Sequence, residues 1–136
     1  QEHMCDAHSH AIVRDTETIK NIIDTFGAHH NQTFVVVDSD GKLTGIITLE
    51  HLKETLLLGD FAESMLAMDI MDKPEYTCSP DMSLPDVYEK FSETDSDAMP
   101  VVGSDGTVYG VAEKFAVDHY LRTRIIELHR KLESLG

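Results

Sequence analysis

The 136-residue sequence is poor in cysteine, poor in basic side chains and free of long apolar runs. Its two cysteines, Cys5 and Cys78, show no spacing that indicates a disulfide framework, and a reducing cytoplasm is therefore the expected compartment. No apolar stretch approaches the ~18 residues of a membrane span, and no signal peptide is recognisable. The sequence also lacks a nucleophile elbow and a Gly-rich phosphate loop, which argues against an enzyme.

Basic residues number 11 against 25 acidic ones, which gives a net charge of −14. A chain this acidic repels phosphate backbones and anionic lipids, so we expect neither nucleic acid binding nor direct membrane insertion. Solubility is a sufficient explanation for the acidity. Because the chain begins at Gln1 rather than Met, we expect a fragment of a longer protein or a processed product.

The sequence contains the same pattern twice, 65 positions apart. FVVVDSDGKLTGIITLEHL occupies residues 34–52, and MPVVGSDGTVYGVAEKFAV occupies residues 99–117. The offset aligns the two segments without a gap, including their Ser-Asp-Gly turns. Two such units indicate an internal duplication, which we divide into residues 1–60 and 61–136. A unit of ~60 residues buries too little surface to be secure alone, so the two units are expected to pack together.

Each unit is predicted to contain a strand, a helix, two strands and a second helix. Runs of β-branched residues predict the strands, an Asp-Gly pair predicts each hairpin turn, and apolar residues at helical spacing predict the helices. The predicted strands span residues 11–13, 34–37, 43–48, 76–78, 99–102 and 108–112. The fold class is therefore α+β, with two β-α-β-β-α units packed sheet to sheet as a pseudo-two-fold pair.

Three further helical details are also predicted. Asp15 and Thr16 are expected to cap its first helix by accepting from free backbone amides. The second helix is expected over residues 49–58, with these side chains inward: Leu49, Leu52, Leu56 and Leu57. Residues 61–71 are expected to form an amphipathic segment that leads into the second copy.

The last helix is expected to start near Lys114 and to run to about Leu135, far beyond its counterpart in the first copy. Its apolar residues recur at steps of three or four: Val117, Leu121, Ile125, Leu128, Leu132 and Leu135. A small domain has little surface left to cover so long a stripe. The helix therefore either folds back on its own domain or contacts another molecule.

This order of elements, present twice, resembles the cystathionine β-synthase (CBS) domain, of which two in tandem form a CBS pair or Bateman module. The segments 34–52 and 99–117 carry the resemblance, and DIMDKPEYTCSPDMSL at 69–84 looks like the start of a second CBS unit. The resemblance implies a regulatory module rather than an enzyme. Its ligand would be AMP, ADP, ATP or S-adenosylmethionine, bound in the cleft between the units.

The resemblance also implies partners. CBS pairs associate into flat dimers, so we expect a homodimer through the CBS faces and the C-terminal helix. The segment linking the units, residues 52–71, looks like that of chloride-channel-family tails and related ion transporters. This likeness implies a cytoplasmic domain attached to, or associated with, a channel or transporter of the inner membrane.

The ribose-binding pattern of the family, G-h-h-[ST]-x-x-[DN], is similar to residues 45–51. Thr48 matches the hydroxyl position, and His51 stands where the family has Asp or Asn. In the second copy Glu113 and Ala116 replace both groups, so the first copy is the expected binding unit. The resemblance implies that these residues frame the ligand: Ala11, Ile12, Val13, Thr33, Phe34, Val35, Thr48 and His51.

Two alternatives stay open at this point. The departures at positions 51, 113 and 116 fit a dimerisation scaffold that binds no small ligand. A metal-sensing module would use the imidazole and thiolate groups near the N-terminus, which suit zinc or nickel. These groups belong to His3, Cys5, His8 and His10. Their spacing matches no established ligand set, and solvated histidines are the simpler interpretation, so no metal site is predicted.

Overall fold

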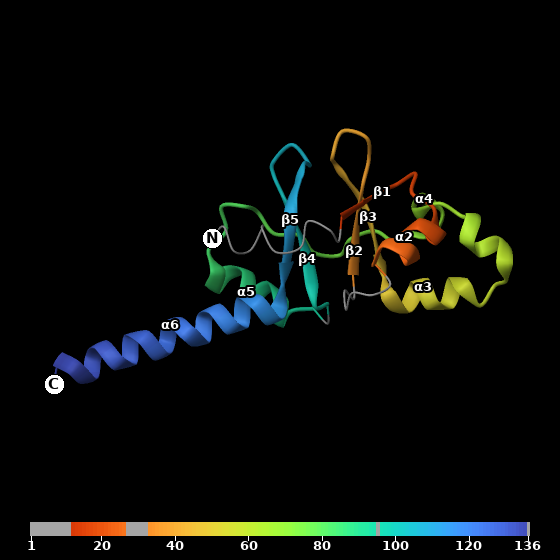
Figure 1. The fold of residues 1–136 in the computed structure, drawn as a ribbon. Helices are drawn as coiled ribbons and strands as arrows, with labels where there is room; N and C mark the ends of the chain where they lie inside the picture. The colour runs from red at the N-terminus through yellow and green to blue at the C-terminus, as the bar shows by residue number, and fades with distance from the viewer. Residues whose placement is uncertain (1–11, 27–32, 95, 136) are drawn as a thin grey trace.

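The computed structural model describes residues 12–26, 33–94 and 96–135, and it places two small sheets at the centre with helices around them (Figure 1). The sheet of the first unit has the order β1-β2-β3, with β1 parallel to β2 and β2 antiparallel to β3. Its elements are β1 (Ile12–Arg14), α2 (Ile19–Phe26), β2 (Thr33–Val37), β3 (Leu43–Thr48) and α3 (Leu49–Leu56). The predicted β-α-β-β-α order is confirmed in this unit.

The second unit repeats the order with a smaller sheet. Its elements are α5 (Leu84–Ser92), β4 (Ala98–Val102), β5 (Val108–Glu113) and α6 (Lys114–Leu135). The strand predicted at 76–78 is wrong as a full strand, because one isolated parallel bridge, between Cys78 and Val101, replaces it in the described residues. Pro100 occupies the position of Val35, the partner of Ile12 in β1. Proline has no N–H, so the parallel ladder loses a donor there.

The segment that joins the units contains a 3-10 helix, η2 (Asp60–Ser64), and a short helix, α4 (Ala67–Ile70), rather than one amphipathic segment. It packs on the first unit, where the amide of Ile19 donates to the carbonyl of Met65 at 2.9 Å. Ala67 and Ile70 are buried in the core of that unit. Contacts with the first unit thus continue past residue 60, and the boundary placed there stays a prediction.

The joining segment crosses β3 at Gly45. Ile46 and Asp72 exchange two backbone hydrogen bonds of 2.8 Å beside this glycine. A Cβ atom at Gly45 would lie 2.9 Å from the carbonyl oxygen of Asp72 and 2.7 Å from the sulfur of Met71. A glycine is therefore required for the backbone to approach this closely.

Three apolar clusters hold the fold together. The first unit is filled by Val13, Ile19, Ile22, Phe34, Val36, Ile47, Leu52, Ala67 and Ile70. The second is filled by Cys78, Val87, Phe91, Met99, Val101, Ala112 and Val117. The third cluster joins the facing sides of the two sheets and contains Val35, Val37, Ala98 and Val111. The predicted sheet-to-sheet packing of an α+β pair is therefore confirmed.

The two hairpins also touch at their turns. The amide of Leu43 donates to the carbonyl of Gly106, and the amide of Val108 donates to the carbonyl of Gly41, both at 3.0 Å. These two bonds are related by the 65-residue offset, and Lys42 pairs with Thr107 between them. The β-bulge of each hairpin also falls at the same place, after the second-last residue of β2 and of β4. The duplication is thus a pseudo-two-fold arrangement in space.

Two predicted details of the first unit are wrong. The side chain of Thr18, rather than Asp15 or Thr16, accepts from the amide of Asn21 at 3.1 Å, because α2 begins at Ile19. In α3 the buried positions are Leu52 and Thr55, whose hydroxyl is satisfied by the carbonyl of His51.

Leu56 and Leu57 therefore point outward, with exposed fractions of 36% and 86%. The helix ends at Leu56, so Leu57 no longer follows the helical spacing that predicted it to be inward.

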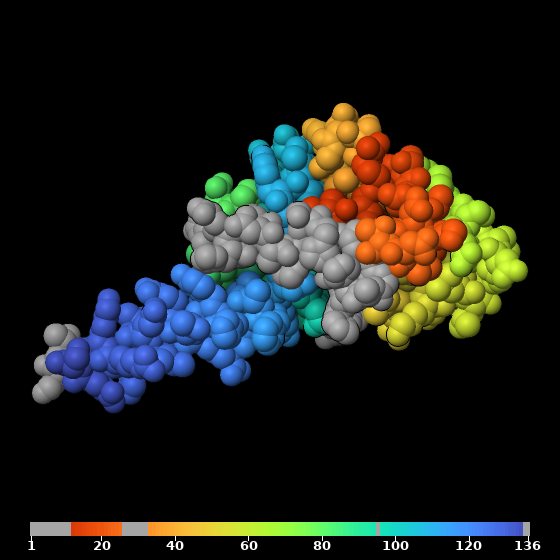
Figure 2. Space-filling model, viewed as in Figure 1, coloured from red at the N-terminus to blue at the C-terminus, as the bar shows by residue number. Residues whose placement is uncertain are grey.

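Helix α6 has the predicted bounds and leaves the body of the molecule (Figure 2). Val117 is buried and Leu121 partly buried against the second core. Every residue from Arg122 to Ser134 is exposed. The helix therefore does not fold back on its own domain along this length. None of the helices in the described residues is long and apolar enough to cross a membrane.

Candidate functional site

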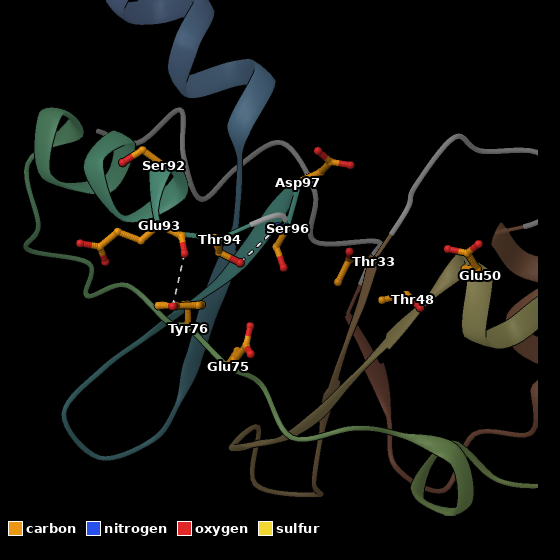
Figure 3. A pocket seen from close by; sticks show the side chains of 10 residues that line it. All are labelled: Thr33, Thr48, Glu50, Glu75, Tyr76, Ser92, Glu93, Thr94, Ser96 and Asp97. Carbon is orange, nitrogen blue, oxygen red and sulfur yellow. Dashed lines mark hydrogen bonds between the residues drawn. The ribbon is translucent and has the colours of Figure 1, made fainter.

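A cleft of about 540 Å³ lies between the two units (Figure 3). The first unit lines it with Thr33 at the start of β2, Thr48 at the end of β3 and Glu50 in the first turn of α3. The second unit lines it with Glu75, Tyr76, Ser92, Glu93, Thr94, Ser96 and Asp97. Its volume is in the range that holds a nucleotide-sized ligand.

The wall from the first unit is set by strand register. Thr33 pairs with Thr48 in the antiparallel ladder of β2 and β3, which places the two side chains next to each other at the end of the hairpin (Figure 3). The hydroxyl of Thr48 accepts from the amide of His51 at 3.1 Å and so caps α3. Its other lone pair and its proton stay available to a ligand.

The opposite wall is the chain from the end of α5 to β4. The hydroxyl of Tyr76 lies 3.4 Å from the carbonyl of Glu93, to which it donates. The amide of Ser96 donates to the hydroxyl of Thr94 at 3.2 Å (Figure 3). These bonds hold a run of hydroxyl groups and one aromatic ring against the threonines of the first unit.

The cleft is acidic. Four acidic residues line it, namely Glu50, Glu75, Glu93 and Asp97, and the carboxylate of Glu93 points away from the first unit (Figure 3). Its described lining residues include no lysine, arginine or histidine. Within the part of the chain that the structure describes, no group of three or more His, Cys, Asp or Glu side chains is placed to hold a metal ion. The cleft therefore favours a neutral or cationic ligand over a free anion.

A second pocket of about 450 Å³ adjoins this cleft and shares Thr33 and Asp97 with it. It is lined further by Tyr88, Ala98, Glu113, Lys114, Phe115 and Asp118. Glu113 thus lies beside a lysine, while Ala116, the other departure from the family pattern, does not line the pocket. The side chain of Phe115 is 80% exposed, so the pocket is open on one side.

The residues predicted to bind a ligand separate into two groups. Thr33 and Thr48 meet at the cleft. The side chains of Val13, Phe34 and Val35 are buried in the apolar clusters, and that of Ile12 is partly buried there. None of these four residues lines either pocket, and their expected role in reading a base edge stays a prediction. Ala11 lies outside the described residues, as do the metal candidates His3, Cys5, His8 and His10.

His51 is directed away from the cleft. Its Nδ1 lies 3.3 Å from Oδ2 of Asp72 in the joining segment, without the alignment of a hydrogen bond. His51 does not line either pocket. In this arrangement it serves the packing between α3 and the joining segment, and its role toward a ligand stays a prediction.

Sequence reasoning missed the wall contributed by the second unit. It placed the ligand in the cleft between the units but named binding residues of the first copy alone, whereas seven of the lining residues belong to the second unit. The 65-residue offset carried the missing signal, because it aligns Tyr76 with Ala11, a predicted pocket residue. In a two-fold pair, the second unit can place its counterpart of a pocket residue in the same cleft. An interpretation that treats each unit separately does not predict this.

Comparison with known proteins agrees with the duplication. The family model of the CBS domain matches the chain twice, at residues 8–58 and 67–117. No curated protein matches the sequence.

Three solved structures illustrate the similarity. A protein described as an acetoin utilization protein (AcuB) from Vibrio cholerae is 18% identical, with a TM-score of 0.78 over 96% of this chain and 94% of that chain. CbpB in complex with c-di-AMP is 12% identical, with a TM-score of 0.77 over 96% and 89%. The cytosolic domain of the Mg²⁺ channel MgtE in complex with ATP is 22% identical, with a TM-score of 0.65 over 82% and 44%.

The matched segments cover most of the chain, and the same unit recurs in the fold on either side of a pseudo-two-fold axis. The protein therefore belongs to the CBS domain family and contains a tandem CBS pair.

Proposed function

We propose that this CBS pair is a regulatory module that binds an adenosyl ligand in the cleft between its units. The observation that carries the proposal is the cleft itself, because its walls come from both units and a ligand in it touches both. A ligand that prefers one arrangement of the units shifts the balance toward it. The neighbours solved with ATP and with c-di-AMP support an adenine-containing ligand.

The charge of the cleft ranks the candidate ligands. Its acidic residues repel the phosphates of AMP, ADP and ATP but attract the sulfonium of S-adenosylmethionine. Tyr76 offers an aromatic surface to the adenine ring, and the hydroxyls of Thr33 and Thr48 offer partners to the ribose. We therefore rank S-adenosylmethionine first, and we expect the nucleotides to need magnesium.

The test is thermal unfolding with S-adenosylmethionine, AMP, ADP and ATP, each with and without magnesium. A ligand at 100 times its Kd stabilises the folded state by ~2.7 kcal/mol, so binding raises the melting temperature by several degrees. We expect the largest rise with S-adenosylmethionine. If none of the four ligands moves the melting temperature under either condition, the ligand-binding proposal is wrong.

A variant pair locates the ligand. Glu50→Gln with Glu75→Gln removes one charge from each unit's side of the cleft, and it should weaken S-adenosylmethionine binding about tenfold by calorimetry. Glu89→Gln removes a charge from an exposed site of α5 outside the cleft and should leave the affinity unchanged. Equal affinities in all three proteins would place the ligand elsewhere.

A ligand-free dimerisation scaffold is the second candidate. The observation that favours it is that the side chains at the ribose-binding positions already make contacts within the fold. Thr48 caps α3, and His51 contacts Asp72. The melting experiment separates the two candidates, because a scaffold gives no shift with any adenosyl ligand. Metal sensing through the N-terminal histidines would instead appear as a zinc- or nickel-induced shift that is lost when residues 1–10 are removed.

We further propose a homodimer in the cytoplasm, formed through the CBS faces and α6, that regulates an attached or associated ion channel or transporter. The likeness to the cytosolic domain of MgtE supports this setting. Sedimentation at micromolar concentration tests the dimer, and a monomer would contradict it. Co-purification of the full-length protein with membranes tests the link to a transporter.

A further inference from the structure

The exposed part of α6, residues 122–134, is an amphipathic helix without a partner in the described residues, and we name it the α6 tail. Its exposed apolar side chains are Ile125, Ile126, Leu128 and Leu132, each at least 49% exposed. The tail carries Arg122, Arg124, Arg130 and Lys131 against Glu127 and Glu133, although the whole chain has a charge of −14. It is therefore a basic, apolar surface on an acidic protein.

Charge disfavours a coiled coil between two α6 tails. The positions that flank the seam of Leu121, Ile125, Leu128 and Leu132 hold Arg122, Arg124, His129 and Lys131. In a parallel or an antiparallel pair these flanking positions face one another, so basic residues would oppose basic residues. The occupant of the tail should instead be apolar with acidic neighbours.

The far end of the molecule carries such a surface, which we name the acidic patch. It follows α3 and continues through η2, and its apolar members are Leu56, Leu57, Leu58 and Phe61. Three of these are at least 61% exposed. Exposed acidic residues lie next to them along the chain, namely Glu54, Asp60 and Glu63, against one exposed lysine, Lys53. Solubility alone does not account for three consecutive exposed leucines, which mark an interaction surface.

The two surfaces cannot meet within one chain, because η2 and the end of α6 lie at opposite ends of the molecule (Figure 1). Helices α3 and α6 run along the same edge of it (Figure 1). A half-turn about an axis across that edge would place the α6 tail of each copy beside the acidic patch of the other. The same contact then forms twice and the assembly closes at two subunits.

We propose that the α6 tail of each copy docks on the acidic patch of a second copy in this antiparallel arrangement. The inference rests on the proposed homodimer and specifies its geometry. Apolar burial of the exposed leucines and isoleucines supplies affinity, while opposite charges set the pairing and its salt dependence. The second copy is the occupant because it offers both the apolar surface and the acidic rim that the tail requires.

Charge reversal tests the pairing by sedimentation velocity of the whole protein. Arg130→Glu with Lys131→Glu reverses the tail at residues outside the ion pairs described within α6. Glu54→Lys with Glu63→Lys reverses the patch. Each double variant should raise the dimer Kd about tenfold or more, because like charges then meet at both contacts. The control, Asp40→Lys with Asp81→Lys, reverses exposed charges outside both surfaces and should leave the Kd unchanged.

Mixing provides the decisive result. An equimolar mixture of the tail-reversed and patch-reversed proteins should restore the dimer, because each contact then joins opposite charges. A chain carrying all four reversals should also dimerise with itself. Circular dichroism of each variant checks that the fold is intact.

A dimer that patch reversal leaves unchanged would overturn this pairing while leaving the homodimer itself in place. A wild-type monomer would overturn the homodimer as well. If that monomer sedimented with phosphatidylserine vesicles, the tail would belong to a membrane surface instead.

Discussion

Two aspartates act as acceptors for the backbone of the hairpin turns. Oδ1 of Asp38 accepts from the amides of Lys42 at 3.0 Å and Asp40 at 2.9 Å, and the bond from Lys42 contributes most to lowering the pKa of Asp38 below 3.8. The amide of Thr107 does the same for the pKa of Asp105. Because a lowered pKa favours the ionised form in the folded state, both groups stabilise the fold above pH 3.8. That contribution is lost as the pH falls through the folded pKa.

Asp38→Asn should therefore reduce the dependence of stability on pH in the acid range. The wild type should lose more free energy of unfolding than the variant between about pH 4 and pH 2. Urea denaturation at several pH values measures this difference. Asp40→Asn is the matched control, since its carboxylate accepts neither of these backbone bonds. Identical pH profiles for wild type and Asp38→Asn would contradict the assignment.

At the scale of one element, α3 depends on its N-cap. The Thr48 hydroxyl satisfies the amide of His51, and Glu50 in the first turn adds a favourable charge at the helix start. Thr48→Val keeps the shape of the side chain and removes the acceptor. It should lower the free energy of unfolding by ~0.5–2 kcal/mol, measured by urea denaturation. Thr48→Ser keeps the cap and should recover most of the loss, whereas equal losses would point to packing.

The elements that sequence predicted well are those with strong local signals. The hairpins at Asp40-Gly41 and Asp105-Gly106 require positive φ at their glycines, 80° for Gly41 and 91° for Gly106. The β-branched residues on either side of each turn favour strands. The failures have tertiary causes. Pro100 removes a backbone donor from the parallel ladder, so the segment 76–78 forms only one bridge, and the early end of α3 leaves Leu57 exposed.

The candidate site was predictable only in part, because half of it depends on how the two units pack together. Thr33 and Thr48 were found because the repeat and the family pattern both indicate the end of the first hairpin. The loop from Ser92 to Asp97 carries no motif, and it becomes a wall of the cleft only because the two sheets pack face to face. Such a contact depends on the pairing of the units and has no local signature in the chain.

At the scale of the whole molecule, the two units depend on the cluster between their sheets. Val35 and Val111 are fully buried in it, one from each sheet. A double-mutant cycle of Val35→Ala and Val111→Ala should show a coupling of at least ~0.5 kcal/mol, because both truncations open the same interface. Val36→Ala and Val101→Ala form the control cycle, since these valines belong to separate cores. Additivity in the first cycle would mean that the units pack independently.

Lys42 and Thr107 occupy the same place in the repeat and face each other where the hairpins meet. A position on a two-fold axis confronts its own counterpart, so a strictly repeated sequence would set one lysine against another there, and like charges directly opposite destabilise a strand pair. With threonine on one side, the ammonium of Lys42 is free to reach the carbonyl of Asp105, to which it donates at 3.0 Å. Two identical chains that met in this way would carry the same residue on both sides, so neither lysine could be replaced alone. Joining the copies in one chain therefore allows the two residues that meet at the axis to differ.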